Sequence, residues 1–89
     1  MFAIMTVTGI DSTGIIASVS TALAELGVNI VDVSQTLMSG YFTMILRVEF
    51  DDAQTSLAEI RAALEPVEKS KQQVIRIQSE DLFTAMNEV

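Results

Sequence analysis

The feature that most constrains the fold is the stretch Tyr41–Phe50, in which apolar side chains occupy every second position. This period of two is typical of a β-strand with one buried face. The intervening positions are mixed rather than polar, and Tyr41, Thr43 and Ile45 suit contact with a second sheet or a ligand. The stretch therefore predicts a strand with one face in a core and another face suited to an interaction.

Three other segments have the character of strands. Residues 1–7 form a short apolar run, which is typical of a central strand buried on both faces. Residues 28–37 are rich in β-branched side chains but alternate imperfectly, which favours a bulge or a second face that meets a partner. Met38-Ser39-Gly40 suits a hairpin connection to the next strand. Residues 72–78 predict a fourth strand at a solvated edge of the sheet.

Two segments change to the helical period of 3.6 residues. The first begins at Ile15, after several turn-forming residues, and ends before Gly27 in the C′ position. The second has an apolar stripe that includes Leu57 and Val67. We expect Pro66 to mark its end, because proline cannot continue the ladder of helical hydrogen bonds.

The start of the second helix has two candidates. Ser56 and Glu59 have the spacing of a capping box, and Asp52 is an equally good cap. Near the C-terminus, residues 79–81 resemble a cap followed by two acids in the first turn of a third helix. Leu82, Phe83 and Met86 give this short helix an apolar face, which must dock on its own domain or across a dimer.

The predicted order is β-α-β-β-α-β with a short C-terminal helix. This order builds an α+β, ferredoxin-like sandwich with a four-stranded antiparallel sheet and helices on one face. A chain of 89 residues has the length of one domain. Its hydrophobic content of 49% is high for that size, so we expect another copy or a partner to cover one face. A rich core in a monomer is the alternative.

Composition excludes several kinds of chemistry. The sequence has no cysteine and no histidine, which removes disulfides, thiolates and the commonest metal ligand and general base. We therefore expect no metal site, no cofactor and no catalytic residues. Adjacent carboxylates such as Asp51 and Asp52 are better explained as caps and solvated acids than as an acid–base pair.

Charge and hydropathy restrict the partners and the compartment. The chain has 5 basic and 12 acidic residues, so its net charge is −7. Nucleic acids and anionic membranes both require clustered cations, and we expect neither as a partner. No apolar run reaches the ~18–20 residues that cross a bilayer. The N-terminus lacks the basic flank of a signal peptide, so we expect a cytoplasmic protein.

The turn after the first strand carries the most specific pattern, Thr8-Gly9-Ile10-Asp11-Ser12-Thr13-Gly14-Ile15-Ile16. Together with Leu26-Gly27-Val28-Asn29-Ile30, it resembles the signature of ACT domains: an acidic residue and a glycine in the first loop, then a G-x-N-I step into the second strand. Gly40-Tyr41-Phe42-Thr43-Met44 and residues 79–86 resemble one branch in particular, the stand-alone bacterial single-ACT proteins. The resemblance covers essentially the whole chain, so we expect residues 1–89 to form one ACT-like domain.

The resemblance implies pairing of domains, with amino acids or similar metabolites bound where the first loop and helix meet the facing copy. Backbone N–H groups at a helix N-terminus attract a carboxylate, and an acid or amide side chain can hold an ammonium group. The expected ligand-binding residues are Asp11, Ser12, Thr13, Gly14, Ile15, Asn29 and Ile30, and the expected interface residues are Gln35, Tyr41 and Thr43. The structural alternative is that Gly14 serves only the turn and Asn29 only pairs with a neighbouring loop.

The loop departs from the common ACT pattern at two positions. A basic residue usually follows the aspartate, where this chain has Ser12, and proline usually precedes the glycine, where it has Thr13. The missing cation weakens the expectation of charge-based recognition at the loop. The first hypothesis is therefore a regulatory homodimer that senses an amino acid, and the alternative is a ligand-free adaptor homodimer that engages a partner protein.

Overall fold

A computed structural model describes residues 1–10 and 13–82 of the chain. The elements follow one another in the predicted order, β-α-β-β-α-β. Their bounds are β1 (Phe2–Ile10), α1 (Ile15–Glu25), β2 (Asn29–Met38), β3 (Tyr41–Glu49), α2 (Leu57–Lys71) and β4 (Gln73–Ser79).

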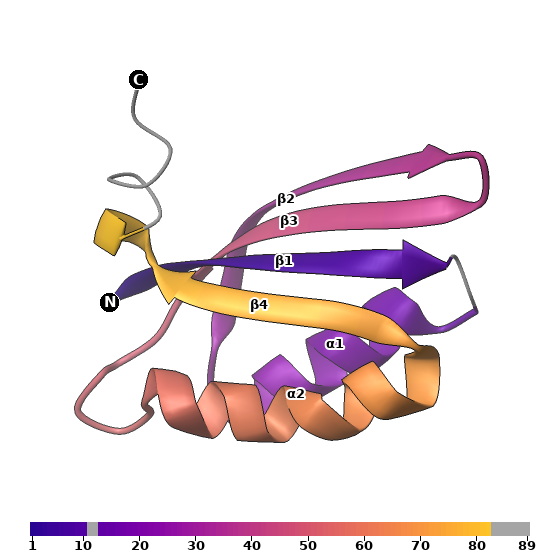
Figure 1. Cartoon of the computed structure of the whole chain (residues 1–89). Helices are drawn as coiled ribbons and strands as arrows, with labels where there is room; N and C mark the ends of the chain where they lie inside the picture. The colour runs from indigo at the N-terminus through magenta and orange to yellow at the C-terminus, as the bar shows by residue number, and fades with distance from the viewer. Residues whose placement is uncertain (11–12, 83–89) are drawn as a thin grey trace.

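The four strands form one antiparallel sheet in the order β2-β3-β1-β4. Both α1 and α2 lie on the same face of it, and the opposite face, here called the open face, is covered by neither of them (Figure 1). This arrangement confirms the ferredoxin-like prediction. It also confirms that β4 lies at an edge and that β1 lies inside the sheet.

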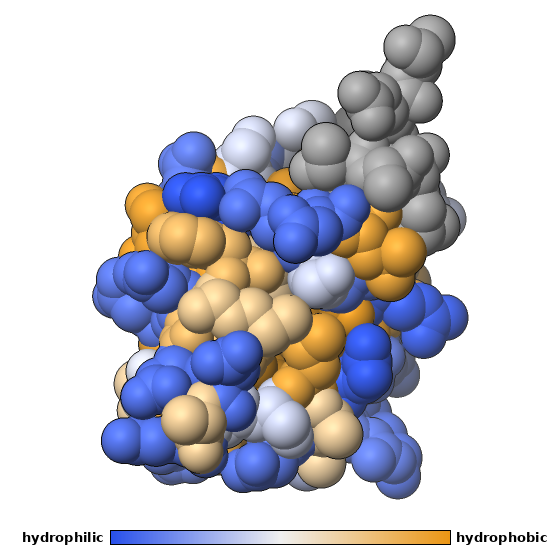
Figure 2. Space-filling model, turned by 90° about the vertical axis from the view of Figure 1, so that its left-hand side faces the viewer, coloured by the Kyte–Doolittle hydropathy of each residue, from blue (hydrophilic) through white to orange (hydrophobic). Residues whose placement is uncertain are grey.

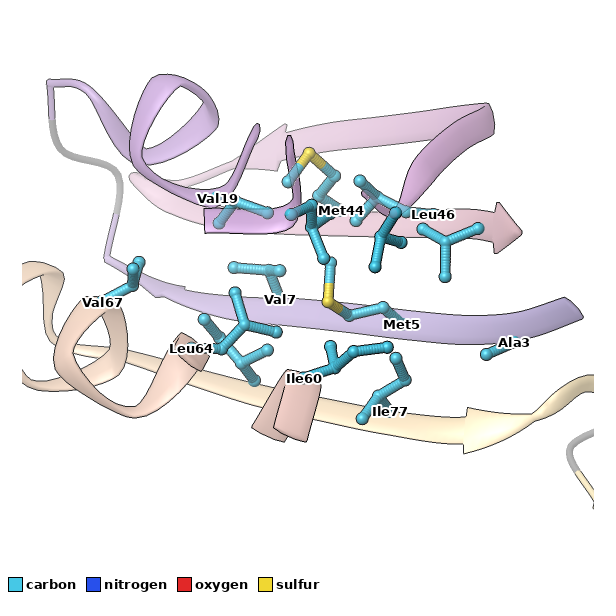
Figure 3. Close-up of a cluster of buried hydrophobic side chains, with 14 of the residues drawn as sticks. Ala3, Met5, Val7, Val19, Met44, Leu46, Ile60, Leu64, Val67 and Ile77 are labelled. Carbon is cyan, nitrogen blue, oxygen red and sulfur yellow. The ribbon is translucent and has the colours of Figure 1, made fainter. Parts of the chain in front are cut away.

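The core lies between the sheet and the two helices. Figure 3 shows side chains from β1, β3 and β4 directed toward those of α1 and α2. The core side chains are almost completely buried: the exposed fraction is 0% for Met5, Val19, Val48 and Ile60, and 2% for Leu64. The buried residues of α2 are spaced four and three positions apart, at Ile60, Leu64 and Val67, so they lie on one side of the helix. This side packs against the sheet.

The prediction that the first strand is buried on both faces is wrong. Ala3, Met5 and Val7 on the helix side of β1 are fully buried, but the residues between them are only half-buried. The reason is that the helices cover one face of the sheet only. The apolar run of residues 1–7 therefore leaves Phe2 and Ile4 on the open face.

The bulge and the hairpin that the sequence favoured are both present. The register between β2 and β3 shifts between Ile30 and Asp32, which inserts Val31 as the extra residue. Ser39 and Gly40 both have positive φ angles, 53° and 81°, as a two-residue type I′ turn requires. This turn sets the register in which β2 pairs with β3.

Helix α1 ends in the manner expected of a C′ glycine. Gly27 has a φ angle of 72° and donates to the carbonyl of Ala24, and Val28 donates to the carbonyl of Leu23. These two bonds form a Schellman motif, which satisfies carbonyls at the helix end. The motif turns the chain back so that β2 can begin at Asn29.

Ser56 rather than Asp52 caps the second helix. The amide of Glu59 donates to Ser56 Oγ at 3.1 Å. The prediction that Pro66 ends this helix is wrong, because α2 continues to Lys71 with Pro66 inside it. Pro66 is exposed and removes one helical hydrogen bond, whereas burial of Val67 in the next position holds the last turn on the sheet.

Replacing Pro66 with alanine is expected to stabilise the protein by about 1–3 kcal/mol, because alanine restores the missing N–H donor in a helix interior. The change in the free energy of unfolding is measured by urea titration. Glu65→Ala, one position earlier and also exposed, is the control and should change stability little. Equal stability of Pro66→Ala and the wild type would contradict this account.

The C-terminal helix begins as predicted. Residues 80–82 are helical, and the amide of Leu82 donates to Ser79 Oγ at 3.2 Å, which makes Ser79 the cap. The predicted contributions of Phe83 and Met86 lie outside the described residues. None of the helices in the described ranges is long and apolar enough to span a membrane.

Candidate functional site

The candidate ligand site lies where β1 passes into α1. Gly14 is the N-cap of α1 and has a φ angle of 84°, a left-handed conformation that favours glycine. Thr13 and Gly14 are exposed, and Ile15 is buried beneath them. The first turn of α1 contains no acidic residue, so its positive end is not offset by a carboxylate of that turn. Asp11 and Ser12 lie outside the described residues.

Two residues from the far end of the chain support this loop. Lys71 Nζ donates to the carbonyl of Thr13 at 3.0 Å, and Gln73 Nε2 donates to the carbonyl of Ile10 at 2.7 Å. Both side chains come from the junction of α2 and β4, where Gln72 adopts a left-handed conformation and ends the helix. Sequence analysis missed both residues, because they are separated from their partners by 58 and 63 positions.

Gly9 allows β1 and β4 to approach each other at the base of the loop. A Cβ atom at this position would lie 2.7 Å from Gln73 Oε1 and 2.8 Å from the carbonyl oxygen of Gln72. Both distances are shorter than van der Waals contact permits. Gly9 therefore lets the Gln73 side chain lie beneath the loop.

Asn29 and Ile30 do not join this site within one chain. Asn29 pairs with Glu49, which in turn pairs with Phe2 at the start of β1, whereas the loop follows the end of β1. Helix α1, with 11 residues and a length of about 16 Å, separates Gly14 from the start of β2. Asn29 is exposed and Ile30 is half-buried.

The predicted interface residues lie on β2 and β3. Gln35, Tyr41 and Thr43 are all exposed. Tyr41 pairs with Ile10 of β1, which places Tyr41 at the end of the sheet that carries the loop. Thr43 lies further along the open face, and Gln35 lies in the middle of β2.

The two edges of the sheet differ in how their backbone groups are satisfied. On β4, the amide of Ile75 donates to Glu68 Oε2 at 3.0 Å, and the carbonyl of Ile77 accepts from Arg61 at 3.1 Å. Both side chains come from α2 and lie in a groove of about 700 Å³ between α2 and β4. Arg61 and Glu68 thus bond to backbone groups of β4 that a further strand would need, so this edge is protected against pairing with another strand.

The edge of β2 is more open. Because Met38 and Tyr41 flank a two-residue turn, the alternate residues Val33, Gln35 and Leu37 direct their N–H and C=O groups away from β3. Asp32 Oδ1 accepts from the amide of Val33 at 2.9 Å. Among the described residues no side chain bonds to the backbone of Gln35 or Leu37.

The side chains along this edge are also unusually apolar. Val33 and Leu37 are paired with residues that point to the helix side, yet they are 51% and 60% exposed. Figure 1 shows why these side chains are exposed: β2 starts beside the helices and moves away from them toward the hairpin. At the end of the molecule that carries the N-terminus, by contrast, hydrophilic side chains interrupt the hydrophobic ones (Figure 2).

An ion pair on the open face was also missed by sequence analysis. Arg47 Nε lies 2.7 Å from Glu80 Oε1, and its second hydrogen bond to this carboxylate is 3.2 Å long. The guanidinium lies 3.9 Å from the centre of the Phe2 ring. These hydrogen bonds lower the pKa of the Glu80 carboxyl and raise the pKa of Arg47. The pair joins β3 to the start of the C-terminal helix across β1, far from the loop.

Residues 1–78 match the family model of the ACT domain. The chain belongs to the ACT domain family. A UPF0237 protein of Corynebacterium efficiens is 64% identical over 89 residues, which cover 100% of both chains. An ACT domain protein from Streptococcus pneumoniae is 42% identical, with 93% of each chain covered and a TM-score of 0.80.

The ACT fold also occurs within larger proteins. The chain is 32% identical to the regulatory subunit of aspartate kinase from Thermus thermophilus, with a TM-score of 0.69. That match covers 86% of this chain and 50% of the subunit. The ACT domain is a regulatory module of a small-ligand-binding kind, and the structure of this chain is that of such a module.

Proposed function

We propose that this protein is a cytoplasmic homodimer of single ACT domains that binds an amino acid or a similar metabolite and regulates without catalysis. The observation that carries the proposal is the separation of the two halves of the predicted site. Gly14 lies at one end of α1, and Asn29 lies past the other end. A second copy is needed to bring both to one ligand.

The open edge of β2 is the surface through which we expect the two copies to pair. Val33, Gln35 and Leu37 offer backbone groups and exposed apolar side chains along one stretch, and the β4 edge is occupied by Arg61 and Glu68. Antiparallel pairing of two β2 strands around a twofold axis would continue the sheet from one copy to the other. It would also bury Val33 of one copy near Leu37 of the other.

Such a twofold axis turns one copy end for end relative to the other. The start of β2 in one copy then lies at the end of the shared sheet where the other copy has its β1–α1 loop. Asn29 of one copy and Gly14 of the other thus approach the same boundary. A ligand held there contacts both copies, so its binding and the stability of the dimer are linked.

Regulation would then rest on differential affinity. A ligand that contacts both copies binds the dimer more tightly than the monomer, and it shifts the population toward the dimer. No bond in the ligand has to change. A partner protein that responds to this shift would contact a surface that is present only in the monomer or only in the dimer.

The test is thermal unfolding of the purified protein in the presence of each of the twenty L-amino acids and a set of common metabolites. A compound at about 100 times its Kd adds roughly 2.7 kcal/mol to the stability of the folded state. For a domain near this size, we expect the midpoint to rise by about 10 °C. A flat result with a protein that unfolds cooperatively would remove the ligand-binding proposal.

An adaptor homodimer is the second candidate, favoured by the open face of the sheet. Ile10, Tyr41, Ile45 and Val74 are large hydrophobic residues that remain at least 44% exposed. Apolar side chains of this size on a sheet face suit contact with another protein. A flat ligand panel together with a stable dimer would favour this function.

A further inference from the structure

The groove between α2 and β4 has the size and the lining of a binding site. Its volume of about 700 Å³ lies within the range of about 300–1,000 Å³ that small-molecule sites occupy. Two alanines one helical turn apart, Ala58 and Ala62, line it from α2 and leave space beside the helix. Leu82 lines it from beyond the end of β4 and is 51% exposed. The groove therefore presents apolar surface to an occupant.

Two arginines line the same groove from its two walls. Arg61 belongs to α2 and Arg76 to β4, and both residues are exposed. Arg61 donates to the carbonyl of Ile77 at 3.1 Å, which holds the guanidinium at the groove. A guanidinium has five N–H donors, so this one bond leaves most of them for a ligand.

The two acids of the groove have partners other than these arginines. Glu68 Oε2 accepts from a backbone amide of β4 at 3.0 Å, and Glu65 Oε1 lies 3.5 Å from Lys69 Nζ. Within residues 1–10 and 13–82, no carboxylate lies within 4.0 Å of the side-chain nitrogens of Arg61 or Arg76. Two of the 5 basic residues in a chain of net charge −7 thus lie together in one groove, without an ion pair in those ranges.

We propose that this groove binds a small amphiphilic anion, with its carboxylate on Arg61 and Arg76 and its apolar part on the alanines and Leu82. The planar fork of a guanidinium matches a carboxylate through two parallel hydrogen bonds. Contact with the alanines and Leu82 removes apolar surface of both partners from water. Because β4 lies at the opposite edge of the sheet from β2, the groove stays accessible in a dimer that pairs through β2. The inference does not depend on the proposed function.

The test titrates the ¹⁵N-labelled protein with 3-phenylpropanoate, a carboxylate with an apolar body, and follows the backbone amide signals by NMR. Signals of residues that line the groove, such as Ala62 and Ile77, are expected to shift and to saturate. The control compounds are 3-phenylpropanamide, which keeps the apolar body without the charge, and acetate, which keeps the charge without the body. Both should bind at least about 10-fold more weakly, because each makes only one of the two kinds of contact.

Three variants separate the groove from the charge of the whole protein. Arg61→Gln should weaken the binding of 3-phenylpropanoate about 10-fold, because it removes charge-assisted hydrogen bonds. Ala62→Leu fills the apolar part of the groove and should weaken binding to a similar extent without any change of charge. Lys69→Gln is the matched control, because it removes one positive charge from the same helix at a position that does not line the groove. It should bind as the wild type does.

All three positions are exposed, so each variant should fold, and its thermal unfolding midpoint without added compound checks this. Equal weakening in Arg61→Gln and Lys69→Gln would show that binding follows net charge, and it would overturn the inference. Equal binding of the acid and the amide would also overturn it, as would the absence of a saturable shift at the groove. None of these results changes the amino-acid screen, which tests the proposed function at a separate site.

Discussion

Replacing Ile60 with alanine is expected to lower the free energy of unfolding by about 2–5 kcal/mol. Ile60 has 0% exposed surface and lies in the first turn of α2, with its side chain directed to the sheet (Figure 3). Truncation removes buried apolar surface and leaves a cavity between the helix and the strands. A domain of this size has only about 5–15 kcal/mol of stability, so the loss is a large share of the total.

Ile16→Ala is the matched control, because Ile16 is also an isoleucine in a helix but is 47% exposed. Its effect should stay within about 0.5 kcal/mol, since little surface returns to water on unfolding. Both variants are measured by urea titration at one protein concentration, which holds any contribution of dimerisation constant. Similar losses in the two variants would contradict the position of the core between α2 and the sheet.

Replacing Leu37 with lysine is expected to weaken the homodimer by at least about 100-fold, because an unpaired ammonium would have to be buried in the shared interface. Leu37 is 60% exposed in the single copy and lies on the open edge of β2. The single copy should therefore fold normally. Sedimentation at several protein concentrations measures the dissociation constant.

Val74→Lys is the control for this charge, because Val74 is 48% exposed but lies on β4, at the opposite edge of the sheet. We expect it to leave the dissociation constant unchanged. If Val74→Lys separates the copies and Leu37→Lys does not, the dimer forms through the open face or the β4 edge. In that case the proposed pairing of β2 strands is wrong.

Local patterns in the sequence were sufficient for most of the fold. The period of two from Tyr41 predicted β3, Met38-Ser39-Gly40 predicted the hairpin, and Gly27 predicted the end of α1, all of which the structure confirms. Each rests on interactions between residues close in the chain. The ACT resemblance was likewise visible in the order of the motifs, and the family comparison confirms it.

Local rules failed where distant contacts decide the outcome. Proline normally ends a helix, yet α2 passes through Pro66, because Val67 is buried against the sheet and outweighs one lost hydrogen bond. The apolar run of β1 suggested burial on both faces, but only the placement of the two helices determines which face is covered. A pattern cannot show on which side of a sheet its partners lie.

The sequence by itself determined the elements, their order and the loop that begins α1. Only the tertiary structure decided what surrounds that loop, because Lys71 and Gln73 reach it from residues 58 and 63 positions away from their partners. The tertiary structure also decided that Gly14 and Asn29 lie at opposite ends of α1, and that the β2 edge of the sheet is more open than the β4 edge. These features depend on strand order and register, which are set by packing of the whole sheet rather than by neighbours along the chain.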